Sequence, residues 1–380
     1  MEKNKLKIRD KVAQKKKHWV RLTRFCNNNC LFCLDKDAQN GEIISFDKIT
    51  EDLKKGKKEG ALKVVLSGGE PTLHPQIAKI IIEAKKLGYQ HAQIISNGRM
   101  LSAEEFVKEL KNAGLDEITL SLHSHKKEQF EEITQVEGSY LQAMRGLINA
   151  LKYNFVVSVD IVINKINYKT LKDTLKFFIK LGVSEFDLLH LIPFGSAWLN
   201  KDKVYYSPIK AKKYLDKAFK LSKNEGLFIW TNRLPAVYLE GYEDLIQHPA
   251  KLKDEMKERG RGFRGYFRND IFLPCFGERC NYCFIAGFCQ DLIEFKTKKI
   301  LEAKNSPLCL NREKNLNRVE KSLRFQQNFN LNRFLDFYIK NRYFVKSLRC
   351  KKCPHSNNCN GAWIEDIRQK GFKILRPFKK

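Results

Sequence analysis

Strand-like and helix-like segments alternate along the first half of the chain, and this alternation constrains the fold more than any other feature. Strands that alternate with helices indicate a parallel sheet with right-handed crossovers, so we expect an α/β fold. Six strands suit a curled, incomplete barrel better than a flat doubly wound sheet, although the pattern alone leaves that choice open. The expected strands are residues 18–24, 61–66, 93–95, 117–122, 155–163 and 185–192, and the expected helices are 44–60, 75–87, 103–113, 140–152 and 169–181.

The 380 residues are enough for two folded units. Residues 205–260 look mostly helical, and from 262 onward Cys, Gly and aromatic residues dominate. We therefore expect four segments, namely a basic N-terminal segment (1–17), the barrel (18–200), a helical linker or substrate region (201–261) and a small Cys-rich, cluster-binding domain (262–380).

The chain is strongly basic, with 71 Lys and Arg against 43 Asp and Glu and a net charge of +28. Such a charge attracts nucleic acid or acidic peptides, but a codon bias towards Lys would produce it equally well. No secretory signal and no apolar stretch of about 18 residues is found, so we expect a cytoplasmic protein without a membrane span.

The 11 cysteines point to metal chemistry. Their odd number and the lack of an export signal argue against a disulfide framework. Thiolates crowded at spacings of two to five residues repel one another unless a cation or cluster takes up the charge. Apart from Cys309, the cysteines form three clusters: Cys26, Cys30 and Cys33; Cys275, Cys280, Cys283 and Cys289; and Cys350, Cys353 and Cys359.

The first cluster has the spacing of a catalytic site. One face of a helix is a poor explanation, because the intervening residues 27–29 are three asparagines. Zinc is a second alternative, but a fourth nearby ligand is missing. Three thiolates on a four-iron cluster leave one iron open to a small ligand, and Phe32 places an apolar ring beside it.

Here the sequence resembles the radical SAM superfamily. Cys26, Cys30, Phe32 and Cys33 match its Cys-x3-Cys-x-aromatic-Cys signature after the first strand, and Gly68-Gly69-Glu70 ends the second strand. The resemblance covers roughly residues 18–200 and implies a partial (β/α)6 TIM-type barrel with its active site at the carboxyl ends of the strands. It also implies that Gly68, Gly69 and Glu70 hold the amino group of S-adenosylmethionine, and that a flavodoxin or ferredoxin donates electrons.

Further polar residues end the later strands. In the family such positions contact the cofactor, which makes Ser121 and Asn164 the preferred cofactor-binding candidates, ahead of Ser96 and Asn97. A capping or turn role is the alternative for each of them. His123 and His125 are candidates to face the substrate, although a surface loop position is the more common outcome.

The later cysteines resemble the SPASM domain, which binds two auxiliary [4Fe-4S] clusters. Two runs share the spacing Cys-x2-Cys-x5-Cys, but Ile293 and Trp363 stand where the usual run has a fourth cysteine. Cys275 and Cys309 are the natural replacements, the pairing stays open, and zinc is the alternative metal. The two runs are Cys280, Cys283 and Cys289, and Cys350, Cys353 and Cys359.

The resemblance implies an enzyme that cleaves S-adenosylmethionine to a 5′-deoxyadenosyl radical, which abstracts hydrogen from a substrate. The substrate is expected to be a peptide or protein, or else a small molecule, and a peptide-modifying maturase is the first expectation. One alternative is an RNA-modifying radical SAM enzyme, suggested by the charge of +28. The other is a zinc-stabilised nucleic-acid-binding protein without enzymatic activity.

Overall fold

The computed structural model describes residues 16–257, 260–269, 277–307, 309–310, 322–325 and 329–378. Cys275 of the second cysteine cluster lies outside these residues, as does the expected basic segment up to residue 15. The described chain divides into two compact units, of which the first ends at Asn232 and the second begins at Arg233. The first unit therefore extends beyond the boundary at 200 expected from the sequence, and the expected linker 201–261 is shared between both units.

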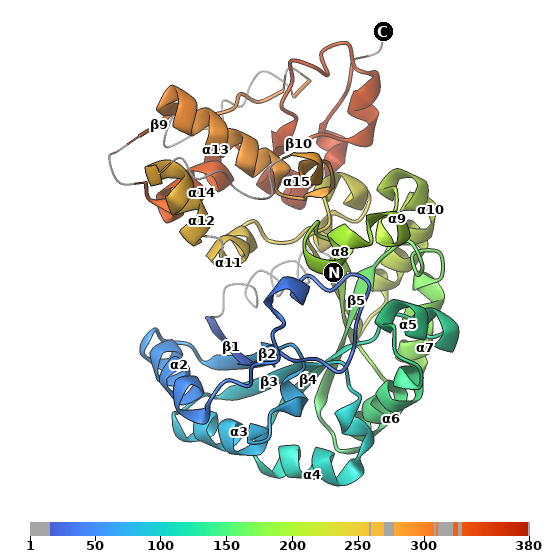
Figure 1. Cartoon of the computed structure of the whole chain (residues 1–380). Coiled ribbons are helices and arrows are strands. Elements are labelled where there is room, and N and C mark those ends of the chain that lie inside the picture. Colours follow the sequence, from blue (N-terminus) through green and yellow to red (C-terminus); the bar gives the residue numbers. More distant parts are fainter. Residues whose placement is uncertain are drawn as a thin grey trace. The chain divides into compact units, whose positions relative to one another are not determined.

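The N-terminal unit contains one curved sheet of seven strands in the order β1-β2-β3-β4-β5-β6-β7, and all neighbours are parallel (Figure 1). This confirms the expected α/β fold with a partial barrel. The strands are β1 (Lys17–Thr23), β2 (Lys63–Gly68), β3 (His91–Ser96), β4 (Glu117–Ser121), β5 (Val156–Ile163), β6 (Glu185–His190) and β7 (Phe228–Asn232).

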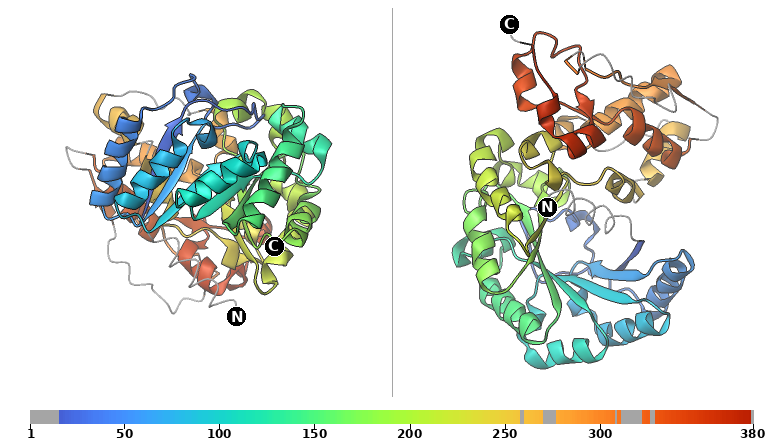
Figure 2. Two further views of the ribbon diagram at one scale, coloured as in Figure 1. Left: turned by 90° about the horizontal axis from the view of Figure 1, so that it is seen from below. Right: turned by 180° about the vertical axis from the view of Figure 1, so that it is seen from behind.

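Helices cover the outer face of this sheet, as the views of Figure 2 also show. Alternate strand residues such as Val64, Ile94 and Leu120 are fully buried, which is the pattern of strands covered by amphipathic helices. The helices are α2 (Phe46–Lys58), α3 (Ile77–Lys86), α4 (Glu104–Asn112), α5 (Lys127–Thr134), α6 (Ser139–Lys152), α7 (Leu171–Lys180), α8 (Gly195–Leu199), α9 (Lys201–Val204) and α10 (Pro208–Phe219).

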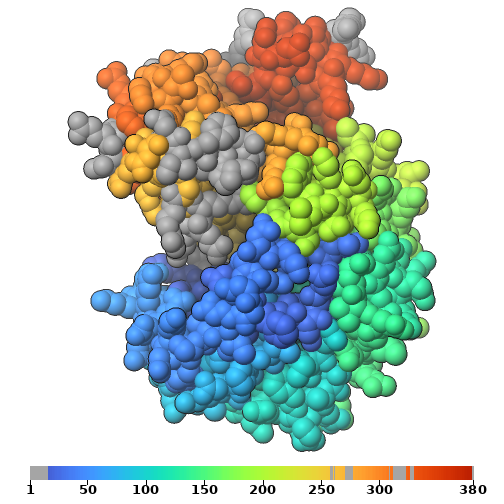
Figure 3. Space-filling model, in the orientation of Figure 1, coloured from blue at the N-terminus to red at the C-terminus, as the bar shows by residue number. Residues whose placement is uncertain are grey.

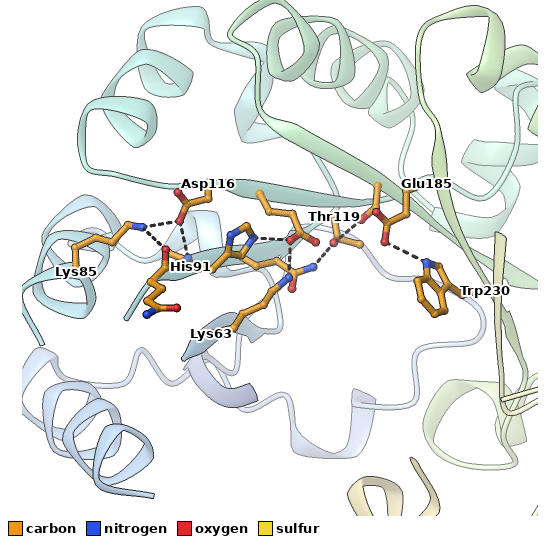
Figure 4. A network of polar contacts seen from close by, with 12 residues as sticks. Lys63, Lys85, His91, Asp116, Thr119, Glu185 and Trp230 are labelled. Carbon is orange, nitrogen blue, oxygen red and sulfur yellow. Dashed lines mark hydrogen bonds and ion pairs between the residues drawn. The ribbon is translucent and has the colours of Figure 1, made fainter. Parts of the chain in front are cut away.

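Polar side chains alternate with these apolar residues at the amino ends of the strands (Figure 4). The Glu117 carboxylate accepts hydrogen bonds from Lys63 Nζ at 2.5 Å and from His91 Nε2 at 2.7 Å. Burial alone would raise the pKa of Glu117, but the bond from His91 and the charge of Lys63 hold it below its usual value. Trp230 Nε1 donates to Glu185 at 3.1 Å in the same network. This end of the sheet is thus stabilised by paired charges, and the carboxyl ends remain for chemistry.

The C-terminal unit packs its helices around an aromatic core that includes Phe288, Phe334 and Tyr338. Arg342 donates two hydrogen bonds of 2.8 Å to the buried Asp291 carboxylate. Its helices are α11 (Lys251–Lys257), α12 (Gly260–Asn269), α13 (Ala286–Lys298), α14 (Leu331–Asn341) and α15 (Ile364–Lys370). Two short antiparallel pairs complete it, β8 (Ile300–Glu302) with β9 (Ser322–Arg324) and β10 (Phe344–Val345) with β11 (Ala362–Trp363).

No helix in the described part of the chain is long and apolar enough to cross a bilayer.

Candidate functional site

The first cysteine cluster lies in the loop that follows β1, at the carboxyl end of the sheet. In the space-filling view the segment after β1, in dark blue, reaches the surface of the N-terminal unit (Figure 3). The backbone N–H groups of Asn29 and Leu31 donate to the carbonyls of Thr134 and Ile133 at the end of α5, both at 3.0 Å. Later segments of the chain therefore hold this loop in place.

A second anchor comes from α8. Ser196 N–H donates to the Cys33 carbonyl at 2.8 Å, and Asn200 Nδ2 donates to the Leu31 carbonyl at 3.1 Å. Gly195 has a φ of +53°, and a Cβ there would lie 2.3 Å from the Cys33 oxygen. Glycine is therefore required where α8 meets the cysteine loop.

The three thiols of the loop influence one another electrostatically. Burial raises the pKa of Cys26 to about 11 and also raises the pKa of Cys30 and Cys33. The charge of Cys33 raises the pKa of Cys26 further, and both of these thiolates act on Cys30. Bound iron would remove this repulsion, because thiolates are the form that binds metal.

The chemistry of the donor set fits iron. Thiolates are the ligands that hold iron–sulfur clusters, and the loop after β1 carries three free cysteines. Cys26, Cys30 and Cys33 are thus a donor set that fits an iron–sulfur cluster.

Three hydrogen-bond donors point at these sulfur atoms. Cys26 Sγ accepts from Asn28 N–H at 3.4 Å and from Asn97 Nδ2 at 3.9 Å. Cys33 Sγ accepts from Gln39 Nε2 at 3.5 Å. Gln39, which directly follows a short 3-10 helix (Lys36–Ala38), was not predicted, because no motif in the sequence relates it to Cys33.

The Gly-Gly-Glu turn packs directly against the residues that precede Cys26. Gly69 N–H donates to the Thr23 carbonyl at 2.9 Å, and Glu70 N–H donates to the Phe25 carbonyl at 2.7 Å. A Cβ at Gly69 would lie 2.1 Å from the Phe25 oxygen, and one at Gly68 would lie 2.5 Å from the Thr23 oxygen. The two glycines therefore allow this turn to lie close to the backbone of the segment before Cys26.

The Glu70 carboxylate is buried and surrounded by protein donors. Its Oε1 accepts from Thr72 N–H at 3.0 Å, Thr72 Oγ1 at 2.6 Å and Ser96 Oγ at 2.8 Å. Its Oε2 accepts from Asn97 N–H at 2.7 Å. Burial raises the pKa of Glu70, while these hydrogen bonds act in the opposite direction. The carboxylate thereby connects the Gly-Gly-Glu turn to the end of β3.

Three further residues that the sequence analysis singled out, Asn164, Ser121 and His125, lie at the ends of strands or in the loops that follow them. The fully buried Asn164 closes its own turn, since its Oδ1 accepts from Ile166 N–H at 2.9 Å. Ser121 ends β4 and is paired in register with Asp160 of β5. His125 hydrogen-bonds the Thr174 hydroxyl of α7 at 2.9 Å. The capping alternative therefore describes Asn164, and His125 packs against a covering helix.

His123 lies against the aromatic residue of the cysteine motif. Its ring meets the Phe32 ring edge-on, with centroids 4.8 Å apart, and its Nδ1 accepts from Val162 N–H at 3.3 Å. Burial lowers the pKa of His123 to about 3, and it lowers the pKa of His190, which contacts the Tyr206 hydroxyl, to about 4. Both histidines are therefore neutral in the folded protein at neutral pH.

Stability is expected to fall on mild acidification because of these two histidines. Below a pH of about 6.5 the unfolded chain binds a proton at each histidine that the folded protein does not bind. Each should lower the free energy of unfolding by about 1.4 kcal/mol per pH unit as the pH falls from about 6.5 towards the folded pKa. Urea unfolding between pH 7 and 4.5 measures this slope. His190→Gln should reduce the slope, and a slope that stays the same in this variant would contradict the prediction.

All three Cys-x2-Cys segments form the same backbone turn. The N–H of the last cysteine donates to the carbonyl of the first at 3.0 Å for Cys30–Cys33, 3.3 Å for Cys280–Cys283 and 3.1 Å for Cys350–Cys353. The two later segments lie at the ends of 3-10 helices, Glu278–Tyr282 and Leu348–Lys352. The three pairs of cysteines therefore share one local backbone turn.

The structure groups Cys309 with the third cysteine cluster. Besides burial, the charges of Cys309, Cys359 and Cys353 raise the pKa of Cys350, so each of these three thiols lies close enough to Cys350 to act on it. Cys359 Sγ accepts from Gly361 N–H at 3.3 Å. In the second cluster Cys289 lies on α13 and is buried in the aromatic core. The grouping of Cys309 was left open by the sequence, because no spacing rule relates it to Cys350.

Comparisons with known proteins agree with this arrangement. Residues 20–178 match the family model of the Radical SAM superfamily. The chain is similar to the probable GTP 3′,8-cyclases of Sulfurisphaera tokodaii (35% identical over 183 residues, 46% of this chain and 56% of that protein) and of Saccharolobus islandicus (33% identical over 178 residues, 46% of this chain and 57% of that protein). It thus spans about half the length of these curated relatives.

One solved structure resembles almost the whole chain. Streptococcus suis SuiB bound to its precursor peptide SuiA aligns with a TM-score of 0.50 and 15% identity, covering 99% of this chain and 79% of that one. At this identity the likeness concerns the fold alone.

Proposed function

The chain carries a radical SAM domain over residues 20–178, and from this premise we propose that it cleaves S-adenosylmethionine reductively in order to modify a peptide. The observation that carries the proposal is the packing of the Gly-Gly-Glu turn on the backbone at Thr23 and Phe25, directly before Cys26. The two segments that the family uses for the cluster and for the methionine moiety are therefore neighbours.

In this proposal Cys26, Cys30 and Cys33 hold a [4Fe-4S] cluster with one iron left for S-adenosylmethionine. The bound cluster and S-adenosylmethionine together supply a 5′-deoxyadenosyl radical that abstracts hydrogen from the substrate. The protein holds the thiolates with N–H donors and fixes the loop through α5 and α8. Phe32 of the loop packs edge-on against the ring of the buried His123.

We also propose cluster ligands in the C-terminal unit. Cys309, Cys350, Cys353 and Cys359 would hold one auxiliary cluster, because the charges of the other three thiols act on Cys350. Cys280, Cys283 and Cys289 would hold a second one together with Cys275, which lies outside the described residues. Such clusters can accept the electron that an oxidised substrate gives up.

A peptide is the first candidate substrate. It is supported by the fold likeness to SuiB over 99% of the chain, together with the two cysteine sets of the C-terminal unit. A guanine nucleotide is the second candidate, because the relatives that share 33–35% identity with 46% of this chain are named GTP 3′,8-cyclases. RNA remains an option that only the net charge of +28 favours.

The test of the activity is Cys30→Ala in anaerobically purified protein. With dithionite and S-adenosylmethionine, the wild type should release 5′-deoxyadenosine and the variant should release none, because the cluster loses one of its three ligands. Cys309→Ala is the matched control and should lower the iron content while 5′-deoxyadenosine is still formed. Formation of 5′-deoxyadenosine by Cys30→Ala would contradict the proposal.

The substrate class can be tested with the same assay. Precursor peptides encoded beside the gene, GTP, and RNA are offered separately with deuterium in place of carbon-bound hydrogen. Transfer of deuterium into 5′-deoxyadenosine should occur with a peptide. Transfer from GTP alone would replace the peptide assignment by the nucleotide one. A substrate affinity that falls steeply with salt would instead favour RNA.

A further inference from the structure

The Glu70 carboxylate has little capacity left for a ligand. It is 1% exposed, and its oxygen atoms accept four hydrogen bonds from Thr72, Ser96 and Asn97. A carboxylate offers about four lone-pair sites, so these donors satisfy most of them. An ammonium group that bound to Glu70 would have to displace a protein donor.

Asn97 connects Glu70 to the first cysteine cluster. Its N–H donates to Glu70 Oε2 at 2.7 Å, and its side-chain Oδ1 accepts from Arg99 N–H at 3.0 Å. With Oδ1 fixed in this way, Nδ2 is turned towards Asn27 Oδ1 at 2.7 Å and Cys26 Sγ at 3.9 Å. Asn97 is 8% exposed, so the surrounding protein restricts the orientation of its amide.

An N–H group that points at a cluster thiolate affects the reduction potential. Reduction adds one negative charge to the cluster, and a nearby N–H dipole stabilises that charge. Loss of the donor should therefore lower the potential, so that the cluster becomes harder to reduce.

From these contacts we propose that Glu70 is a positioning residue for the cluster, which it influences by holding the Asn97 amide against the Cys26 thiolate. This inference rests on the proposed function, because it requires a cluster on Cys26, Cys30 and Cys33. It assigns to the glutamate of the Gly-Gly-Glu turn an effect that is present before S-adenosylmethionine binds.

Gln39 provides an independent comparison. Its Nε2 donates to Cys33 Sγ at 3.5 Å from the segment after the cysteine loop. Within the described residues, its side chain makes no hydrogen bond to Glu70 or Asn97. Removing Gln39 should lower the potential by a separate route. Its effect should therefore add to that of Glu70, whereas the effects of Glu70 and Asn97 should overlap.

The experiment measures the midpoint potential of the cluster by EPR-monitored titration without S-adenosylmethionine. All variants also carry Cys309→Ala and Cys280→Ala, so that the first cluster dominates the EPR signal. Glu70→Asp keeps the negative charge near Cys26 but withdraws the carboxylate from Asn97 N–H. It should shift the ratio of reduced to oxidised cluster about tenfold towards the oxidised form, which is 59 mV for one electron. Asn97→Ala should do the same, the double variant should shift no further, and Gln39→Leu should add its own shift.

The possible outcomes distinguish a failure of this inference from a failure of the proposed function. If Glu70→Asp leaves the potential unchanged and only weakens S-adenosylmethionine binding, Glu70 holds the cofactor and the inference is overturned. If Glu70→Asp does not fold, an unchanged potential in Asn97→Ala overturns it equally. If the wild type holds no cluster on these cysteines, the proposed function itself fails.

Discussion

Gly69→Ala is expected to remove the iron of the first cysteine cluster and to leave the C-terminal cysteines loaded. The new Cβ would lie 2.1 Å from the oxygen and 2.5 Å from the carbon of the Phe25 carbonyl, which are backbone atoms that cannot rotate away. The Glu70 N–H bond to that carbonyl must then break and Cys26 must move. Iron should fall by about four atoms per chain, the content of one [4Fe-4S] cluster.

The control for Gly69→Ala is Gly56→Ala on α2. A Cβ there would lie 2.2 Å from the His18 ring, so the overlap is similar but involves no residue of the cysteine loop. Overlaps of this kind typically cost about 1–3 kcal/mol of stability. Gly56→Ala should therefore lower the melting temperature and keep the iron. Equal iron loss in both variants would show that general destabilisation, and not the position of Cys26, is responsible.

Gly361→Ala is expected to have the complementary effect. Gly361 has a φ of +87°, its N–H donates to Cys359 Sγ, and a Cβ would lie 2.1 Å from the Val345 oxygen. We expect loss of iron from the third cysteine set, while 5′-deoxyadenosine formation without substrate continues. Iron analysis and product chromatography measure both effects.

Gly371→Ala is the matched control in the same unit. It has a φ of +79°, but its Cβ would meet only the end of the Glu243 side chain, at 3.3 Å. It should lose stability and keep iron. Loss of 5′-deoxyadenosine in Gly361→Ala would mean that the first cluster depends on the third cysteine set, contrary to this expectation.

The sequence predicted the sheet well where apolar runs alternate with amphipathic helices. All six expected strands occur within a few residues of their predicted limits. The seventh strand, Phe228–Asn232, was not predicted, because five residues within a stretch of mostly helical composition carry a weak signal. The sheet supplies the neighbour β6 that stabilises this strand, and the sequence does not show that pairing.

The sequence predicted the part of the candidate site whose residues lie close together along the chain. The spacing of Cys26, Cys30 and Cys33 identified a thiolate set, but the donors from Gln39 and Asn97 depend on how separate segments meet. The surroundings of Glu70 were missed for the same reason, since Ser96 and Asn97 follow it by 26 and 27 residues.

The anchors of the cysteine loop have a consequence for biosynthesis. The loop ends soon after the first strand, yet its backbone is held by Thr134 and Ser196, which leave the ribosome more than a hundred residues later. The thiols therefore emerge early and gain their final positions only when α8 has been made. Iron delivered to the nascent chain would meet an unanchored loop, so insertion of the proposed cluster would follow the folding of most of the barrel.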